Sequence, residues 1–397
     1  MPVSTDASKI NELLTRGVEQ IYPTLEYLRE RLNSSKSLSL YVGYDPTGPS
    51  LHIGHGITLL KLRQFQDLGH KVIMLIGDFT AMIGDPTDKS ATRSQLIREQ
   101  VIENCKEYQR QASAILNFAG DNPAELRYNS EWLAKMNFAD VLELASHFTV
   151  PRLLERDMFQ ERIKQGKTIH LHEFLYPIMQ GYDSVAMNVD GEAGGNDQTF
   201  NMLAGRTLMK ELKNKEKFVL STKLLADNSG KKMGKSEGNM ISLDDTAENM
   251  FGKVMSWSDE MIASGFELCT RVPMDKVEEI RAELLTDINP RDLKLRLAEE
   301  VTKTFLGEEA AQKGLSHFAS VIQGAGKPED MAELKPSSYD ILSVLVEAGF
   351  AKSNGEARRS IDGRGVKVNE EAVKSYDYKV NPGDVVQKGK RFFLRVL

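Results

Sequence analysis

Two histidines stand three residues apart at the point where a predicted strand gives way to a predicted helix. Residues 43–49 form a turn rich in glycine and proline, and His52-Ile-Gly-His55 follows it. Backbone N–H groups at a helix start attract anions, and side chains three residues apart share one face. His52 and His55 could therefore donate hydrogen bonds to a phosphorus centre, or they could simply cap the helix.

A second candidate segment, residues 230–239, reads Gly-Lys-Lys-Met-Gly-Lys-Ser-Glu-Gly-Asn. Its three glycines permit the backbone changes that a moving loop needs. Lys232 and Lys235 offer two cations that can follow a departing pyrophosphate. The alternative is a solvated surface loop with no chemical role.

Three polar side chains share one face of a helix predicted at 170–187. Tyr176, Gln180 and Asp183 lie at positions i, i+4 and i+7. A phenol, an amide and a carboxylate that face the same way suit an amino-acid ligand with an ammonium group and a hydroxyl group. The same pattern also fits a polar surface face.

A Gly-Gly turn at 194–195 precedes Asn196 and Asp197, one of which could cap the next helix, and Asp197 could bind a ribose hydroxyl. No metal site is predicted, because His170 and His172 lack a third ligand at suitable spacing. The two cysteines of the chain show no ligand spacing, so neither a disulfide framework nor a zinc cluster is expected.

The histidine pair falls inside a predicted strand–helix–strand unit at 37–46, 54–68 and 71–79. Residues 72–76 are apolar on both faces, as in a strand buried within a parallel sheet. The first domain is therefore predicted to be doubly wound α/β. Further helices are predicted at 94–118, 138–148, 170–187 and 197–212, and strands near 186–191 and 217–220.

The pattern changes after about residue 240, where charged helical segments replace the α/β alternation. Helices are predicted at 244–256, 275–285, 291–306 and 308–322, followed by an aperiodic stretch with Gly and Pro. The expected organisation is a catalytic domain at 1–240, an all-α domain at 241–325, a linker at 326–337 and a small α+β unit at 338–397.

Composition excludes several classes of protein. With 397 residues, 41% hydrophobic and a formal charge of −6, the chain is not mainly disordered. No apolar run suits a membrane span and the N-terminus has no apolar signal core, so we expect a cytoplasmic protein. The acidity argues against a nucleic-acid partner, but residues 337–397 carry eleven Lys and Arg against eight Asp and Glu, a charge of +3.

Together these segments resemble the class I aminoacyl-tRNA synthetases, and within that class the bacterial tyrosine-specific branch. Residues 52–55 match the His-Ile-Gly-His signature, and residues 232–236 match Lys-Met-Ser-Lys-Ser except for Gly234, where serine is usual. Residues 75–79 and 83–86 are similar to a strand and loop of that family, and residues 352–369 resemble the S4 RNA-binding domain. The resemblance covers nearly the whole chain, in the same order.

The resemblance implies a Rossmann-like fold and two successive reactions. L-Tyrosine and ATP would give tyrosyl-adenylate and pyrophosphate, and the tyrosyl group would then pass to the 3′ end of tRNA(Tyr). Mg²⁺ would be carried with ATP, and the protein would be a homodimer without a membrane partner.

The resemblance also assigns residues. The substrate phenol would contact Tyr41 and Asp183, although position 41 varies among branches of the family. The residues implied around the ammonium group and the rest of the amino acid are Asp85, Tyr176, Gln180 and Gln198. The ATP-binding residues would be Gly43, Asp45, Gly54, Gly195, Asp197, Met233 and Ser236. The catalytic residues would be Thr47, His52, His55, Lys232 and Lys235. RNA phosphates would meet Arg358, Arg359 and Arg364.

Three alternatives stay open from the sequence. A tryptophan-specific relative shares both signatures but ordinarily lacks the C-terminal RNA unit. A small nucleotidyltransferase with a similar histidine motif leaves the helical block and the RNA unit without a role. An inactive RNA-binding paralogue would not need the intact histidines, lysines and Asp183.

Overall fold

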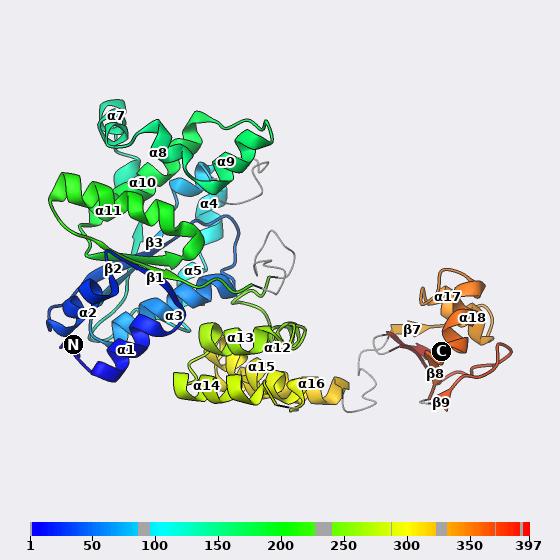
Figure 1. The fold of residues 1–397 in the computed structure, drawn as a ribbon. Helices are drawn as coiled ribbons and strands as arrows, with labels where there is room; N and C mark the ends of the chain where they lie inside the picture. Colours follow the sequence, from blue (N-terminus) through cyan, green and yellow to red (C-terminus); the bar gives the residue numbers. More distant parts are fainter. Residues whose placement is uncertain are drawn as a thin grey trace. The chain divides into compact units, whose positions relative to one another are not determined.

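The computed structural model describes residues 2–85, 96–226, 240–286, 288–322, 332–369, 371–389 and 392–397. Its contacts divide the chain into two compact units, Met1–Leu315 and Ser316–Leu397. The first unit contains a sheet with helices on both faces and a group of helices after it (Figure 1). Within the described residues, no helix is long and apolar enough to cross a bilayer.

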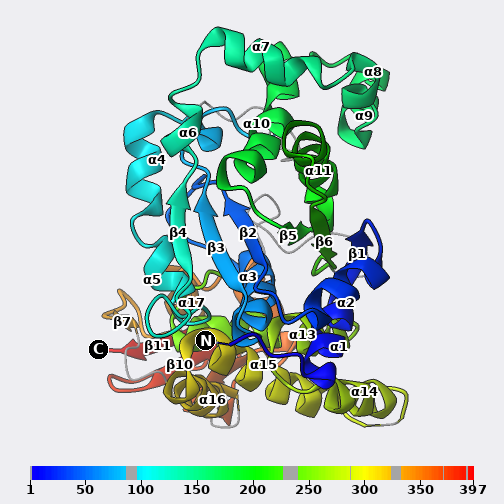
Figure 2. The same cartoon turned by 90° about the vertical axis from the view of Figure 1, so that its left-hand side faces the viewer.

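The first unit is built on a six-stranded sheet. The order across it is β1-β6-β5-β2-β3-β4, which Figure 2 shows edge to edge. All neighbouring strands run parallel except β1, which pairs antiparallel with β6. The predicted doubly wound parallel sheet is confirmed, with one antiparallel edge strand that was not predicted. The strands are β1 (Val18–Tyr22), β2 (Ser39–Tyr44), β3 (Lys71–Ile76), β4 (Glu125–Tyr128), β5 (Gly191–Gly195) and β6 (Phe218–Thr222).

The chain reverses its direction of travel across the sheet between β2 and β5. From β2 it moves outward through β3 to β4, and it then returns to the other side of β2 to form β5 and β6. At such a switch point the loops after two adjacent parallel strands diverge and leave a crevice at their carboxyl ends. The fold therefore places a ligand site after Tyr44 and after Gly195.

Three long helices flank this point. The helix α3 (Ile53–Asp67) joins β2 to β3, α10 (Leu171–Met187) leads into β5, and α11 (Thr199–Lys213) joins β5 to β6. Figure 1 shows α3 beneath the strands and α11 above them. The helices α10 and α11 approach closely, because a Cβ atom at Gly181 would lie only 3.1 Å from the backbone of Ala204 and Gly205.

The strand predicted near 186–191 is wrong in position. The helix α10 continues to Met187 and ends at Asn188, and the strand β5 begins only at Gly191. Its sequence, Gly-Glu-Ala-Gly-Gly, lacks the β-branched residues typical of strands. Small residues are needed here because a Cβ atom at Gly191 would lie 2.1 Å from the ring of Phe218.

The single helix predicted at 94–118 is two shorter helices in the described part of that range, α4 (Arg98–Cys105) and α5 (Tyr108–Ala112). Side chains of α5 are tied to the turn before the histidine pair. The Tyr108 hydroxyl donates to the carbonyl of Gly48 at 2.7 Å, and Gln111 accepts from the Leu51 N–H at 2.7 Å. These tertiary bonds override a continuous helical pattern.

Of the other helices around the sheet, one was predicted from the sequence and several were not. The helix predicted at 138–148 is α7 (Phe138–Ser146). The unpredicted helices are α1 (Ala7–Thr15), α2 (Leu25–Asn33), α6 (Ser130–Leu133), α8 (Val150–Leu154) and α9 (Asp157–Lys164), with 3₁₀ turns η1 (Thr80–Met82) and η2 (Asn196–Gln198).

The four helices predicted after residue 240 are present, and a fifth, α13 (Met261–Cys269), was not predicted. By its contacts this helical group belongs to the same compact unit as the sheet as far as Leu315, and the boundary with the second unit falls within the last helix. It packs tightly on α3, since a Cβ atom at Gly56 would lie 2.5 Å from the ring of Phe305. The other helices are α12 (Ala247–Met255), α14 (Met274–Glu283), α15 (Pro290–Leu306) and α16 (Glu308–Ile322).

The second unit contains a five-stranded sheet in the order β7-β11-β10-β8-β9, with two helices and its own apolar core. The strand β7 (Ala332–Leu334) lies within the predicted linker 326–337, where it pairs parallel with β11. The remaining elements are α17 (Ile341–Glu347), α18 (Asn354–Asp362), β8 (Val366–Val368), β9 (Glu371–Ala372), β10 (Val385–Lys388) and β11 (Phe392–Val396).

Candidate active site

The structure gathers most of the described candidate residues at the carboxyl ends of β2 and β5. Asp45 follows β2, and Asp197 and Gln198 lie in η2 directly after β5. The helix α10 carries Tyr176, Gln180 and Asp183 to the same end of the sheet, where Tyr176 contacts Asp45 and the carbonyl of Gln180 contacts Tyr41 on β2. The predicted shared face of α10 is therefore turned toward the strands rather than toward solvent.

Asp45 is held at the end of β2 by two hydroxyl groups. Thr80 donates to its Oδ1 at 2.7 Å and Tyr176 donates to its Oδ2 at 2.8 Å. The carboxylate fits only because residue 77 is glycine, since a Cβ atom there would lie 2.0 Å from Asp45 Oδ1. Burial raises the pKa of Asp45 to about 7, so this group changes charge near neutral pH.

Tyr41 and Asp183 form the deepest part of the site. The Tyr41 hydroxyl lies 3.0 Å from Ser184 Oγ and 3.4 Å from the carbonyl of Gln180. Asp183 is 2% exposed and accepts from Trp132 Nε1 at 2.7 Å. Burial raises the pKa values of both Tyr41 and Asp183 well above their ordinary values. Two groups that could form hydrogen bonds with a hydroxyl are thus enclosed by protein.

Asp85 is fixed from two sides. Gln198 Nε2 donates to Asp85 Oδ2 at 2.7 Å, and an Nη2 atom of Arg156 lies 3.6 Å from Asp85 Oδ1. Arg156 is 5% exposed and lies over the rings of Phe159 and Phe200. Burial lowers the pKa of this guanidinium. Sequence reasoning missed Arg156, because an arginine in a short helical segment is more often a surface residue.

Glu192 and Lys217 form a buried ion pair that was also missed. Glu192 lies on β5 and is 1% exposed, and Lys217 precedes β6 and is fully buried. Glu192 Oε1 also accepts from Gln180 Nε2 at 3.0 Å. Position gave a signal for Glu192 alone, whose neighbours Gly191 and Ala193 are small, because Lys217 directly follows Lys215 and Glu216.

The two histidines do cap α3. His52 Nδ1 accepts the Gly54 N–H at 3.1 Å, and His55 Nδ1 accepts the His52 N–H at 3.2 Å. Their rings stack with centroids 3.7 Å apart, and His55 meets the Tyr44 ring edge-on. Because Nδ1 accepts in both rings, the proton of each neutral imidazole lies on Nε2. Capping and donation are therefore compatible roles.

The segment that follows the predicted lysine loop is paired with the start of α3. The Ile53 N–H donates to the carbonyl of Ile241 at 2.9 Å, and the Leu243 N–H donates to the carbonyl of Leu51 at 2.8 Å. The loop residues Lys232, Met233, Lys235 and Ser236 lie outside the described residues. Within the described residues, Ile241 and Leu243 therefore lie beside the histidine pair.

Two glycines and a tight turn shape the backbone around the predicted nucleotide site. Gly43 is exposed, and a Cβ atom there would approach nothing closer than Leu75, at 4.0 Å. At Gly195 a Cβ atom would lie 2.6 Å from Asp197 Oδ1, so glycine lets that carboxylate fold back over the strand end. Thr47 donates its N–H to the carbonyl of Asp45 at 2.8 Å, which tightens the turn after β2.

The three predicted RNA-binding arginines belong to the second unit. Arg358 and Arg359 lie on α18 and Arg364 follows it, and all three are exposed. The Arg358 guanidinium lies 5.6 Å from the centre of the Tyr376 ring. Arg364 adopts a positive φ of 53° in the turn before β8.

Comparison with known proteins identifies the family. The family described as tRNA synthetases class I (W and Y) matches residues 33–322, and the S4 domain matches residues 341–386. A tyrosine–tRNA ligase of Carboxydothermus hydrogenoformans is 43% identical over 412 aligned residues, which cover 100% of this chain and 99% of that protein. One from Thermotoga maritima is 43% identical over 97% of this chain and 96% of that protein.

The chain belongs to the class I tRNA synthetases. Solved structures agree in fold. A mitochondrial tyrosyl-tRNA synthetase of Coccidioides posadasii, truncated at its C-terminus, has a TM-score of 0.65 at 24% identity. The match covers 78% of this chain and 91% of that chain. The Archaeoglobus fulgidus tyrosyl-tRNA synthetase complexed with L-tyrosine has a TM-score of 0.60 at 23% identity. The match covers 78% of this chain and 99% of that chain.

Among the described residues of this synthetase, no group of three or more His, Cys, Asp or Glu side chains is arranged to hold a metal ion. The carboxylates near the site have other partners, as Asp45 and Asp85 illustrate. The described part of the chain therefore offers no resident metal centre for the chemistry.

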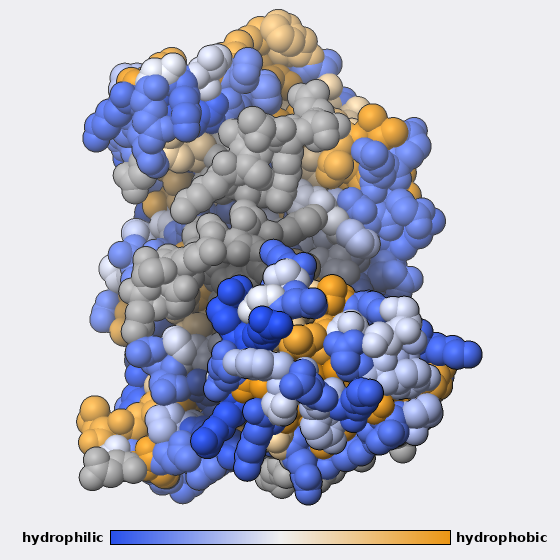
Figure 3. All heavy atoms as spheres, turned by 90° about the vertical axis from the view of Figure 1, so that its right-hand side faces the viewer, coloured by the Kyte–Doolittle hydropathy of each residue, from blue (hydrophilic) through white to orange (hydrophobic). Residues whose placement is uncertain are grey.

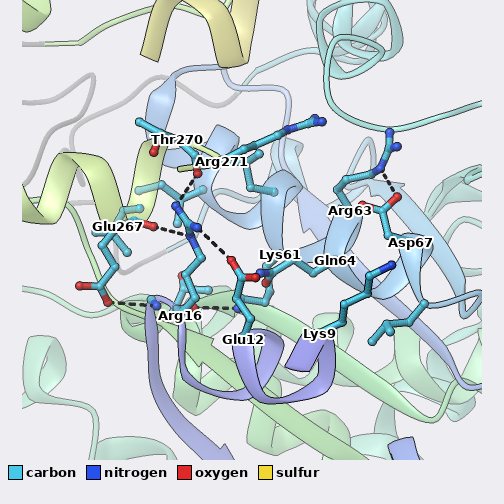
Figure 4. A pocket seen from close by; sticks show the side chains of 16 residues that line it. Lys9, Glu12, Arg16, Lys61, Arg63, Gln64, Asp67, Glu267, Thr270 and Arg271 are labelled. Carbon is cyan, nitrogen blue, oxygen red and sulfur yellow. Dashed lines mark hydrogen bonds and ion pairs between the residues drawn. The ribbon is translucent and has the colours of Figure 1, made fainter. Parts of the chain in front are cut away.

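A pocket of about 380 Å³ lies elsewhere in the synthetase, and its lining includes residues of α1, α3 and α13 but none of the candidate site residues (Figure 4). Arg16 and Lys61 are buried at this pocket. Lys61 Nζ donates to the carbonyls of Leu13 and Arg16, each at 2.8 Å. The guanidinium of Arg16 donates to the carbonyls of Phe266, Glu267, Thr270 and Val272 and to the carboxylate of Glu12.

Proposed function

We propose that this synthetase activates L-tyrosine with ATP and transfers the tyrosyl group to tRNA(Tyr). The observation that carries the proposal is the enclosed pair Tyr41 and Asp183, which suits a ligand hydroxyl at the floor of the switch-point crevice. It is supported by relatives that are tyrosine–tRNA ligases along nearly their whole length. A structural neighbour was solved with L-tyrosine.

The amino acid would be recognised at both ends. Its phenol would meet Tyr41 and Asp183, and phenylalanine would leave these buried groups unpaired, which is costly. Its ammonium group would meet Asp85, Tyr176 and Gln180. Gln198 supports this arrangement through its hydrogen bond to Asp85 at 2.7 Å. Selectivity for tyrosine over tryptophan would follow from the same hydroxyl contacts.

Activation requires no general base. The tyrosine carboxylate, already ionised at neutral pH, would attack the α-phosphorus of ATP, and pyrophosphate would leave. The chain contributes position and charge to this step. The Nε2–H groups of His52 and His55 would donate to the phosphate oxygens, with Thr47 beside them. Lys232 and Lys235 would contact the departing pyrophosphate.

The remaining ATP contacts belong to the strand ends. Gly43, exposed near the end of β2, leaves room for the nucleotide, and Asp197 after β5 would hold the ribose. Asp45, Gly54, Gly195, Met233 and Ser236 complete the proposed ATP-binding set. Mg²⁺ would arrive on ATP as part of that substrate.

The second step and its RNA partner involve the C-terminal unit. After the adenylate forms, a ribose hydroxyl at the 3′ end of tRNA(Tyr) would attack its carbonyl. Arg358, Arg359 and Arg364 would contact RNA phosphates, since arginine forks suit phosphate and all three are exposed. We keep the division into 1–240, 241–325, 326–337 and 338–397 as the functional one. The cytoplasm, where tRNA is charged, is the proposed compartment.

We propose a homodimer, because α7 to α10 leave several large apolar side chains exposed. Phe138 is 76% exposed, Val150 65% and Leu171 79%, values that a monomer rarely gathers in one region. Figure 3 shows apolar residues at the upper end of the molecule, where Figure 1 places α7 to α9. A second copy of this chain would cover them.

Pyrophosphate–ATP exchange with each amino acid in turn tests the function. Tyrosine-dependent exchange supports the proposal. Exchange that only tryptophan supports contradicts the specificity. If none of the amino acids supports exchange, the proposed activity is wrong. An inactive RNA-binding relative would give the last result, and a nucleotidyltransferase would show turnover that no amino acid stimulates.

A further inference from the structure

We propose that the buried ion pair of Glu192 and Lys217 sets the direction of the hydrogen bonds with which the site reads tyrosine. The inference rests on the proposed function and deepens it. Neither residue is proposed to touch the substrate, so both are positioning residues. Each acts through a side chain that is assigned to the amino acid.

The pair lies beneath the site on adjacent strands. Glu192 is on β5, and Lys217 directly precedes β6, which is parallel to β5. The Lys217 ammonium group has three acceptors: the Glu192 carboxylate, Ser184 Oγ at 2.8 Å and the carbonyl of Met202 at 3.2 Å. Its three protons and three acceptors match, so the cation has a fixed orientation.

The first branch runs from Lys217 to Tyr41. Because Lys217 carries protons only, Ser184 Oγ must accept from it. Accepting from a cation makes the Ser184 hydroxyl a stronger donor, which favours donation of its proton to the Tyr41 oxygen at 3.0 Å. The Tyr41 proton is then directed to the carbonyl of Gln180, at the long distance of 3.4 Å, or to the Glu192 carboxylate beside it. A ligand hydroxyl can replace this weak partner.

The second branch runs from Glu192 to Gln180. An ionised carboxylate only accepts, so the hydrogen bond of 3.0 Å requires Gln180 to present its NH₂ group to Glu192. The amide oxygen of Gln180 is then on the other side of the side chain. This orientation makes Gln180 an acceptor, as an ammonium group needs.

Together the branches give the site a polarity that tyrosine complements. Tyr41 donates and Asp183 accepts, so a phenol can accept from the first and donate to the second. Gln180 accepts, so the ammonium group can donate to it. Phenylalanine would leave the proton of Tyr41 with its weak partner and Asp183 without the ligand hydroxyl.

The packing leaves room for this network and for nothing larger. A Cβ atom at Gly205 would lie 2.5 Å from Lys217 Nζ and 2.7 Å from Ser184 Oγ. The close approach of α11 to α10 thus leaves the Lys217 ammonium group no space to move away from Ser184. Lys217 Nζ also lies 5.6 Å from the centre of the Tyr41 ring, so its charge faces that residue directly.

The test is a double variant, Glu192→Gln with Lys217→Gln, which removes both charges together and leaves no buried charge without its partner. Full-length protein is assayed by pyrophosphate–ATP exchange with tyrosine and with phenylalanine. We expect the KM for tyrosine to rise by roughly tenfold or more, and the tyrosine-to-phenylalanine ratio of kcat/KM to fall by roughly tenfold. The KM for ATP should stay within about twofold.

The matched control is Lys215→Met. Lys215 lies two residues before Lys217 and forms an ion pair with Asp190 at 3.1 Å, outside the network, with side chains 29% and 16% exposed. Its KM values and its amino-acid ratio should stay within about twofold of the parent. A second variant, Ser184→Ala, cuts only the branch to Tyr41 and should lower the tyrosine-to-phenylalanine ratio without changing the KM for ATP.

The outcomes separate the inference from the function. If the unsubstituted chain shows no tyrosine-dependent exchange, the proposed function fails. If it does show exchange, unchanged amino-acid ratios in the double variant and in Ser184→Ala overturn the inference alone. A parallel rise of both KM values with a lower melting temperature would also overturn it, because that pattern indicates a purely structural pair. If the double variant does not fold, the result with Ser184→Ala decides.

Discussion

Two regions of this synthetase bury cations, and they do so with different partners. Beneath the amino-acid site, Lys217 meets a carboxylate and a hydroxyl group. At the pocket beside α1 and α13, Lys61 donates to two backbone carbonyls, and Arg16 donates to four backbone carbonyls and one carboxylate. The first arrangement costs desolvation of two charges, whereas the second uses carbonyls that a helix end leaves without partners.

The two sets of partners differ in whether their orientation can change. Carbonyls at the end of a helix are fixed by the backbone, so a side chain that donates to them has one arrangement available and its loss changes stability. Hydroxyl and amide groups can rotate, so a cation or carboxylate beside them selects one of several orientations. We therefore expect substitutions at the α1–α13 pocket to change stability, and substitutions around Lys217 to change substrate selection.

The largest effect is expected for Arg16→Met. The variant would leave the carbonyls of Phe266, Glu267 and Thr270 at the end of α13 buried without this donor. We expect the free energy of unfolding to fall by about 4 kcal/mol, the scale for losing a buried charged partner. Urea denaturation measures this loss. The KM for tyrosine should not change, and a large rise in it would break the comparison.

An intermediate effect that depends on pH is expected for Lys61→Met. Burial lowers the pKa of Lys61 to about 7, from an ordinary value of 10.5. Above pH 7 the folded chain releases this proton while the unfolded chain retains it up to its higher pKa, so Lys61 makes stability rise with pH in that interval. The neutral amine still has two protons for its two carbonyls.

Urea denaturation at pH 7 and pH 9 tests this prediction. The parent chain should gain about 2 kcal/mol more than Lys61→Met between these two values. An equal gain in both proteins would show that Lys61 keeps its charge when buried. Its site would then resemble that of Lys217 more closely than the two sets of partners indicate.

The smallest effect is expected for Lys223→Met. Lys223 forms an ion pair with Glu267 at 3.0 Å, but its side chain is 45% exposed. Glu267 keeps a second cationic partner, Arg281. The variant should lose less than about 1 kcal/mol in a thermal or urea titration, as exposed pairs usually do. A loss as large as that of Arg16→Met would mean that burial of the cation does not decide the energy.

Much of the candidate site could be predicted from sequence because its residues lie in short motifs. The spacing of Tyr176, Gln180 and Asp183 fixes their common face once α10 is a helix, and the structure confirms the helix over the predicted range. The histidine pair is at a helix start, as its turn predicts. Local spacing is sufficient to predict how site residues face one another wherever a single helix or turn carries all of them.

The rest depends on contacts between distant segments. Glu192 and Lys217 are 25 residues apart, and Arg16 meets carbonyls about 250 residues away. A charged residue beside a strand ordinarily predicts a solvent-exposed position, so only the pairing of β5 with β6 reveals that these charges are buried together. The strand β5 was misplaced for a related reason, since Gly191 is required by the distant Phe218 ring and not by local propensity.

The close packing at Gly181 and Gly205 has a consequence for how this site can diversify. One helix, α10, carries Tyr176, Gln180 and Asp183, and its distance from α11 is limited by the backbone contact at these glycines. A single added methyl group at either position would shift these three candidate site residues at once. Evolution can therefore adjust the depth of the amino-acid pocket through a residue that meets no substrate, and surveys of altered selectivity should include both glycines.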